Sequence, residues 1–346
     1  MPSQADFIAS LSPWPKEFGL GRIRALLERL GQPQRRFDAI HVVGSNGKST
    51  ATRTIAELAR AEGRAAGAYT SPHVSGWAER IWVDGAEADF ERAVARVRTH
   101  AEELGATQFE TLTAAAFAEF AEQGIEVAAV EAGLGGRLDA TNVVDAPVVL
   151  LTNVTREHSD VLGETPEQIA KEKLAVAHAA RVVVLSDNIF APLVPQGEIR
   201  LGGAKEAVEA YLGHPVAAGL EAHLPGRFER RNGLVLDGAH TPEAADWLLS
   251  RLPEEEHVLC VSILRDKDAT AILERLARVG RTLVATRSSN DRALDEKELG
   301  RRAEPYFEHV ETIADPRQAL GRARELGPRV LVTGSLYLLA DLSSSD

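Results

Sequence analysis

The sequence predicts an α/β fold: a P-loop-type doubly wound parallel sheet domain, followed by a smaller Rossmann-like α/β domain. Three observations predict it. Short apolar runs recur between helical patterns, which is typical of buried parallel strands. A glycine-rich turn separates an early apolar run from a helical pattern. The chain of 346 residues is long enough for two domains of ordinary size.

Five apolar runs are the expected strands of the first domain. They are Ala39–Gly44, Ala65–Ser71, Glu126–Glu131, Ala146–Val154 and Arg181–Asp187. After the first run, apolar residues recur on one face of Lys48–Glu62, which predicts a helix that Gly63 can end. In such a sheet, ligands bind beyond the carboxyl ends of the strands.

The second part of the chain repeats the alternation. Its expected strands are Leu234–Ala239, His257–Leu264, Arg281–Arg287 and Arg329–Ser335. Residues 188–226, between the two parts, contain several prolines and glycines, which favours a boundary near Pro225. We therefore expect one domain over residues 1–223 and a second over 224–346.

Composition excludes several classes of partner. The net charge of −12 argues against general binding to nucleic acid or to an anionic membrane. Cys260 is the only cysteine, so an intramolecular disulfide is impossible. No apolar run approaches the roughly 20 residues that span a bilayer, and the N-terminus does not resemble a secretory signal. We expect a cytoplasmic protein.

The glycine-rich turn is the strongest local motif. It reads Gly44-Ser45-Asn46-Gly47-Lys48-Ser49-Thr50 between a strand and a helix. Glycines let the backbone curl around an anion, and the helix start directs N–H groups at it. Lys48 supplies a cation for the transferred phosphate, and Ser49 or Thr50 can ligate Mg²⁺. Val42 stands where the full phosphate-loop pattern has its first glycine, and the motif alone fits a GTPase switch as well as an enzyme.

Three further residues have two interpretations each when taken alone. Glu131 ends an apolar strand, so its carboxylate either binds a metal or pairs with Arg137. His158 follows a strand, where a lone histidine is more often structural than a metal ligand. Lys173 lies in a charged run, which is typical of a solvated surface.

Several further motifs occur along the chain in a fixed order. The most specific is the block Glu131–Val143, which reads EAGLGGRLDATNV. The others, in order, are Gly19-Leu20, the phosphate loop, Thr70–His73, Glu79–Ile81, Phe109-Glu110, Thr152–Val154 with Glu157-His158, Ile169–Lys173, Leu224–Glu229, Leu236–His240 and Thr333–Tyr337. On these motifs, the sequence from about residue 18 to the C-terminus resembles the folylpolyglutamate synthase/dihydrofolate synthase family of the Mur ligase superfamily.

The resemblance implies a role for each matching position. Residues matching Ser71, Glu131 and His158 bind Mg²⁺, and Ser49 is a further expected ligand. Two Mg²⁺ ions are expected, and K⁺ is a further cation of such sites. The lysine matching Lys173 is carbamylated by CO₂. Residues matching Arg227 and Asp237 contact the nucleotide and its ribose. Those matching His240 and Ser335 lie near the phosphate and the incoming glutamate, and Arg80 is a candidate for a substrate carboxylate.

The implied activity is an ATP-dependent ligation of L-glutamate to a folate or to dihydropteroate, in a monomer. Lys48, His158 and Lys173 are the expected catalytic residues. The chain departs from the family at Ser45 and Ser49 of the loop and at Thr241, where asparagine is usual before proline. The stretch 186–226 is also short for the family.

Two alternatives remain open from the sequence. One is a Mur-type amino-acid ligase, against which the early phosphate loop argues, because such enzymes carry an additional N-terminal substrate domain. The other is a nucleotide- or folate-binding regulatory protein without catalysis. Retention of Lys48, Glu131, His158 and Lys173 argues against the latter.

Overall fold

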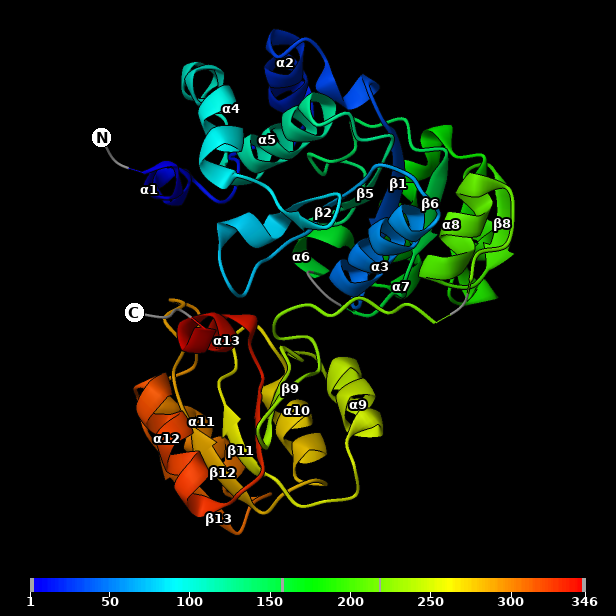
Figure 1. The fold of residues 1–346 in the computed structure, drawn as a ribbon. Helices are drawn as coiled ribbons and strands as arrows, with labels where there is room; N and C mark the ends of the chain where they lie inside the picture. The colour runs from blue at the N-terminus through cyan, green and yellow to red at the C-terminus, as the bar shows by residue number, and fades with distance from the viewer. Residues whose placement is uncertain (1–2, 157–158, 218, 344–346) are drawn as a thin grey trace. The chain divides into compact units, whose positions relative to one another are not determined.

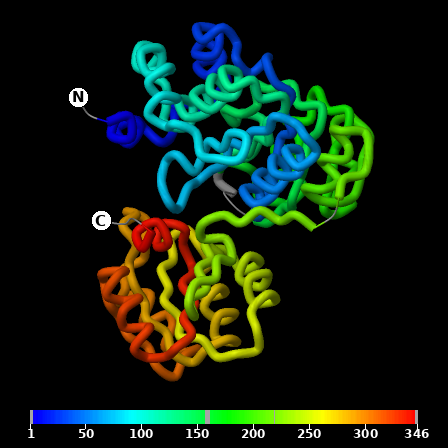
Figure 2. Tube along the Cα trace, viewed as in Figure 1, coloured from blue at the N-terminus to red at the C-terminus, as the bar shows by residue number. Residues whose placement is uncertain are grey.

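The computed structural model describes residues 3–156, 159–217 and 219–343. The chain forms two compact units, which Figures 1 and 2 trace in colour from the N-terminus to the C-terminus. The first unit comprises Met1–Pro72 and Trp77–Ala222, and the second comprises His73–Gly76 and His223–Asp346. The short segment His73–Gly76 therefore packs with the second unit, which no sequence pattern indicated.

An eight-stranded sheet forms the centre of the first unit, in the order β4-β3-β2-β5-β1-β6-β7-β8. All neighbours are parallel except β3, which is antiparallel to both β2 and β4. The central strand β1 pairs Val42 with Glu131 on one side and Val43 with Leu151 on the other. The carboxyl ends of three strands therefore meet at one edge. The strands are β1 (Asp38–Val43), β2 (Ala66–Tyr69), β3 (Ile81–Val83), β4 (Ala86–Glu87), β5 (Val127–Glu131), β6 (Val148–Leu151), β7 (Val182–Leu185) and β8 (Glu198–Leu201).

Helices cover both faces of this sheet (Figure 1). On one face, α3 (Lys48–Ala61) and α8 (Ala204–Leu212) pack through Ile55, Ala59 and Val208. The other face is covered mainly by α5 (Gln108–Glu122), which is buried nearly all round because its central turns are alanine, threonine and phenylalanine. Further helices on that side are α1 (Gln4–Ser10), α2 (Gly21–Arg29), α4 (Phe90–Leu104) and α7 (Pro166–Leu174), and the short helix α6 (Ser159–Leu162) contacts α7.

The second unit contains a six-stranded sheet in the order β13-β12-β11-β14-β10-β9, in which only β9 is antiparallel. Its strands are β9 (Glu229–Arg231), β10 (Leu234–Leu236), β11 (Val258–Val261), β12 (Thr282–Ala285), β13 (His309–Thr312) and β14 (Val330–Thr333). The helices on one face are α9 (Pro242–Arg251), α10 (Ala269–Leu276) and α11 (Glu296–Ala303), and those on the other are α12 (Pro316–Leu326) and α13 (Leu336–Ser343).

The predicted fold class is confirmed. Each of the nine expected strands is present. Strand β1 has the length of its expected run but begins and ends one residue earlier, and the other eight are shorter than their runs by one to five residues. None of the helices among the described residues combines the length and the hydrophobicity needed to cross a bilayer.

Candidate active site

The phosphate loop follows β1 and leads directly into α3. Gly44 has a φ of 147° and Gly47 a φ of 78°, backbone conformations that disfavour a side chain. A Cβ at Gly44 would lie 2.0 Å from Thr152 Oγ1, so only glycine fits there. Gly47 forms the left-handed cap of the helix, and Lys48 is the first helical residue. The loop therefore has the strand, turn and helix start that an anion-binding loop requires.

Residues just after β6 hold this loop from the side. The backbone N–H of Ser45 donates to Asn153 O at 3.0 Å, and that of Asn46 donates to Asn153 Oδ1 at 2.8 Å. Thr152 Oγ1 donates to Asn46 O at 2.7 Å, while Thr155 N donates to Ser45 Oγ at 3.0 Å. Four hydrogen bonds thus fix the loop. Asn153 was matched to the family by sequence, but its anchoring role was not foreseen.

Two lysines converge on one carbonyl oxygen of the loop. Lys48 Nζ donates to Gly44 O at 3.0 Å and to Ser45 O at 3.1 Å. Lys173 Nζ, from α7, donates to Gly44 O at 2.8 Å, and its side chain is only 2% exposed. The interpretation of Lys173 as a solvated surface lysine is therefore wrong. Ile169 lies one helical turn before it on the same buried face.

A buried carboxylate lies beside the loop. Glu131, 2% exposed, accepts a hydrogen bond from Ser49 Oγ at 3.1 Å and one from the backbone N–H of Ser71 at 2.9 Å. The structure therefore brings together three of the expected metal ligands. Carboxylate and hydroxyl oxygens are hard donors of the kind that Mg²⁺ prefers, so this set fits that ion. The fourth expected ligand, His158, lies outside the described residues.

No three His, Cys, Asp or Glu side chains gather as a metal cluster in the described part of the chain. One carboxylate with hydroxyl groups is a sparse set, which suits an ion that retains water and substrate phosphate ligands.

Arg137 does not pair with Glu131, so that alternative is wrong. Its Nε donates to Glu172 Oε2 at 2.9 Å, and its backbone N–H donates to Glu172 O at 3.1 Å. A Cβ at Gly136 would lie 2.5 Å from Lys173 O, so this glycine permits contact between the loop and the backbone of α7. The loop after β5 therefore packs directly on the helix that carries Lys173.

In the second unit, Asp237 follows β10 and is 5% exposed. Its carboxylate accepts hydrogen bonds from Phe228 N at 2.7 Å and Ala239 N at 2.8 Å. Burial raises the pKa of Asp237, while these two N–H groups and the charge of Arg227 oppose that shift. A Cβ at Gly238 would lie 3.2 Å from Arg227 Nη1, which places the guanidinium close to this turn.

His240 and Ser335 lie near the same strand ends. His240 Nδ1 is 2.8 Å from Gly238 O, so this nitrogen carries a proton and donates to that carbonyl oxygen. Thr241, not His240, caps α9. Ser335 Oγ accepts from Tyr337 N at 3.2 Å, as a residue at a helix start does. The neighbouring Gly334 N donates to Ala239 O at 3.0 Å, which brings the two turns together.

Arg80, the expected substrate residue, is 8% exposed and lies in the first unit. Its guanidinium carbon is 5.0 Å from the centre of the Trp77 ring. Tyr69 is a neighbour of Arg80: burial raises the pKa of its hydroxyl, and the charge of Arg80 opposes this. The Tyr69 ring lies 6.0 Å from that of Phe109, which in turn covers Gly133.

Comparison with known proteins assigns the chain to a family. A model of the Mur ligase middle domain matches residues 42–193, and one of the Mur ligase glutamate ligase domain matches residues 226–336. The dihydrofolate synthase/folylpolyglutamate synthase of Mycobacterium tuberculosis is 32% identical over 410 residues, covering 90% of this chain and 84% of the relative. The chain belongs to the folylpolyglutamate synthase/dihydrofolate synthase family.

Other family members agree with this assignment. The Escherichia coli dihydrofolate synthase/folylpolyglutamate synthase is 27% identical, covering 98% of this chain and 94% of the relative. The structure of M. tuberculosis folylpolyglutamate synthase complexed with ADP has a TM-score of 0.88 at 27% identity, covering 99% of this chain and 97% of that one. E. coli FolC in complex with DHPP and ADP has a TM-score of 0.86 at 25% identity, with the same coverage.

The alignment with the M. tuberculosis enzyme is longer than this chain, so that enzyme contains residues that this chain lacks. Residues 186–226 here form η4 (Asn188–Leu193), β8 and α8 with short connections.

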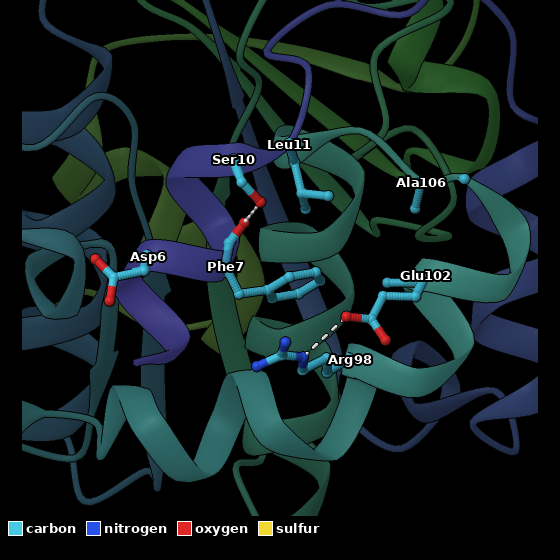
Figure 3. A pocket seen from close by; sticks show the side chains of 9 residues that line it. Asp6, Phe7, Ser10, Leu11, Arg98, Glu102 and Ala106 are labelled. Carbon is cyan, nitrogen blue, oxygen red and sulfur yellow. Dashed lines mark hydrogen bonds and ion pairs between the residues drawn. The ribbon is translucent and has the colours of Figure 1, made fainter. Parts of the chain in front are cut away.

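A pocket of about 450 Å³ lies elsewhere in the first unit, between α1 and the second half of α4 (Figure 3). Arg98 on its wall pairs with Glu102 at 3.0 Å and lies 4.5 Å from the ring centre of Phe7. Arg98 and Glu102 there are thus paired with each other, and none of the family's motif residues lines the pocket.

Proposed function

We propose that this protein is an ATP-dependent ligase that joins the amino group of L-glutamate to a carboxylate of a folate or of dihydropteroate. The observation that carries the proposal is the arrangement around the phosphate loop. A loop that fits a nucleotide phosphate, two lysines on Gly44 O and the buried Glu131 meet at the carboxyl ends of adjacent strands. Family membership supplies the substrate class, because the relatives are named for these reactions.

The chemistry explains why ATP is required. A carboxylate is a poor electrophile toward an amine, since oxide is not a feasible leaving group. Transfer of the γ-phosphoryl group to the acceptor carboxylate gives an acyl phosphate, from which phosphate leaves readily. The neutral amine of glutamate then attacks, and the tetrahedral intermediate collapses to the amide and phosphate.

The chain's own residues contribute mainly position and charge. When nucleotide binds, Lys48 can exchange its two loop carbonyl oxygens for phosphate oxygens, because its side chain starts at the first helical position. The loop amides and the start of α3 stabilise the negative charge of the transferred group. Arg80, with Tyr69 and Phe109 nearby, is the proposed contact for the acceptor in this unit.

Mg²⁺ would be held by Glu131, Ser49 and Ser71 together with His158, and it would offset charge on the phosphates. A divalent ion is consistent with a Yersinia pestis relative solved with AMPPNP and a Mn ion. We also propose two Mg²⁺ ions, a K⁺ ion and a CO₂-derived carbamate on Lys173. The buried position of Lys173 against the phosphate loop supports the carbamate, because an anion there would be able to bind Mg²⁺.

We assign nucleotide binding to residues 1–223 and glutamate ligation to residues 224–346. In the second unit, Asp237 has acceptor capacity left for ribose hydroxyls beyond its two backbone donors, and Arg227 supplies a cation beside it. His240 and Ser335 are the proposed contacts of phosphate and glutamate. We further propose a cytoplasmic monomer that binds neither nucleic acid nor membrane.

Phosphate release tests the proposal. Phosphate release from ATP is measured with purified protein, Mg²⁺ and L-glutamate in three reactions: one with dihydropteroate, one with tetrahydrofolate and one without an acceptor. Release that depends on an acceptor supports the ligase and identifies which of the two activities is present. Binding of ATP or folate without release from either acceptor would contradict the ligase and favour a regulatory role.

A further inference from the structure

A buried polar chain connects the strand under the phosphate loop with the loop that follows Glu131. His41, on β1, lies three residues before Gly44 and has its Nε2 2.9 Å from Thr141 Oγ1. Thr141 Oγ1 in turn makes a short hydrogen bond to Asp139 Oδ1. His41 and Thr141 are fully buried, and Asp139 is 6% exposed. Such a network is costly to bury unless its members are satisfied, so its geometry is closely defined.

The direction of each hydrogen bond follows from the donors available. Asp139 also accepts from Leu134 N at 2.8 Å and Thr141 N at 2.9 Å, so it acts as the acceptor of the network. Thr141 has a single hydroxyl proton, which it gives to Asp139, and it must therefore accept from His41. Burial lowers the pKa of His41 to about 3, so the ring is neutral at physiological pH and its one N–H is on Nε2. Nδ1 has no hydrogen-bond partner among the described residues, which agrees with this tautomer.

The network closes a ring of contacts around the candidate active site. Asp139 ties the loop of residues 132–142 together through Leu134 and Thr141, and Thr141 links this loop to His41 on β1. The same loop contacts α7, where Arg137 N donates to Glu172 O, and Gly136 permits the close approach to Lys173 O. Lys173 then donates to Gly44 O, three residues after His41.

We propose that His41 is a positioning residue for ligation: through Thr141 and Asp139 it sets the loop 132–142, and thereby the place of Lys173 beside the phosphate loop. His41 contacts neither substrate nor metal in this account. The expected changes in kcat rest on the proposed ligase function. The expected changes in hydrogen exchange rest on the geometry of the loop alone.

The test compares variants that remove one hydroxyl. Thr141→Val removes the link between His41 and Asp139 at nearly constant shape, while Thr141→Ser keeps it. Thr111→Val is the matched control, because Thr111 is also fully buried in the first unit and gives its hydroxyl to Thr107 O at 2.8 Å. His41→Gln retains an N–H donor near the Nε2 position, and His41→Leu does not.

We expect Thr141→Val and His41→Leu to lower kcat by roughly 10- to 100-fold, since small misplacements of reacting groups cost this much. ADP affinity should change by less than about threefold, because the hydrogen bonds of Asn153 to the phosphate loop remain. Thr141→Ser and His41→Gln should recover most of kcat, and the double variant His41→Leu/Thr141→Val should be no worse than either single variant. Thr111→Val should lower the melting temperature without lowering kcat.

Amide hydrogen exchange gives a readout that needs no turnover. Thr141→Val should speed exchange in residues 132–142 and at the end of α7, and Thr111→Val should not. Equal kcat for Thr141→Val and wild type, or unchanged exchange in that loop, would overturn the proposal. If wild type does not ligate glutamate but the exchange pattern is as expected, the ligase assignment fails and the positional coupling stands.

Discussion

Lys173 and Gly44 are 129 residues apart in the sequence, yet the ammonium group of Lys173 donates a 2.8 Å hydrogen bond to the carbonyl oxygen of Gly44. Lys48 Nζ donates to the same oxygen at 3.0 Å. Two lysine side chains at one loop carbonyl place positive charge beside the start of α3, which favours binding of a negatively charged group. A nucleotide phosphate is such a group, and the surrounding residues permit specific predictions.

Replacing Lys48 with alanine should abolish acceptor-dependent phosphate release, with kcat lowered at least about 100-fold. The fold should persist, since alanine is a favourable helix residue at this position. Release is measured with saturating ATP, and circular dichroism checks the fold. Lys205→Ala is the matched control, because the one ion pair of Lys205 among the residues that the structure describes is with Glu209 in α8, at 3.5 Å. Turnover of the Lys48 variant near the wild-type rate would rule out a role for this lysine in phosphoryl transfer.

Gly44→Ala should destabilise the first unit by about 2–3 kcal/mol and weaken ADP binding. The new methyl group would collide with Thr152 Oγ1, and the backbone is in a conformation that alanine adopts poorly. Gly47→Ala, whose Cβ would meet open space, should lower the free energy of unfolding by only about 1 kcal/mol. Chemical denaturation measures the free energy of unfolding of both variants. Adding Thr152→Ala should restore part of the loss in Gly44→Ala, and no recovery at all would show that the collision is not the cause.

Lys173→Met should lower kcat at least about 100-fold while preserving ADP affinity, because the loop remains anchored by Asn153. Methionine fills a similar volume, so the buried site should not collapse. Lys171→Met, on the exposed side of the same helix, is the control and should retain activity. If the proposed carbamate forms, removal of dissolved CO₂ should lower wild-type turnover, and bicarbonate should restore it. A fully active Lys173→Met would exclude both roles.

The free energy of unfolding should fall as the pH drops below about 6.5. Burial, with a smaller effect of the charge of His178, lowers the pKa of His41 from 6.5 to about 3. Between these values the unfolded chain binds a proton at His41 and the folded chain does not, so acid favours unfolding by up to about 1.4 kcal/mol per pH unit. Urea denaturation at several pH values measures this slope. His41→Gln should flatten it relative to wild type and to His178→Gln, and an unchanged slope would mean that His41 titrates normally.

The sequence predicted the interior of the fold better than its edges. The nine expected strands lie inside the sheets, where both faces are buried and the residues form apolar runs. Most of the missed strands, β4, β8, β9 and β13, lie at sheet edges. Edge strands are short and carry charges, as Glu229–Arg231 does, and such sequences resemble loops. No apolar run was present to identify them.

In the candidate site, the sequence predicted the features made by neighbouring residues better than those made by residues far apart in the chain. The phosphate loop was identifiable because its glycines and lysine are adjacent in the sequence. The burial of Lys173 was hidden by its charged neighbours, although Ile169 one turn earlier was a usable signal. The links from His41 to Thr141 and from Asn153 to Asn46 span about one hundred residues and depend on strand order, which the sequence pattern did not specify.

The most direct test of the central claim is the mass of the folate product. Wild-type protein is incubated with ATP, Mg²⁺, L-glutamate and either dihydropteroate or tetrahydrofolate, and the acceptor is analysed by mass spectrometry. We expect an acceptor that gains one glutamyl residue, with ATP required, and no gain with Lys48→Ala. An unchanged acceptor in both reactions, from protein that is folded and binds ADP, would contradict it.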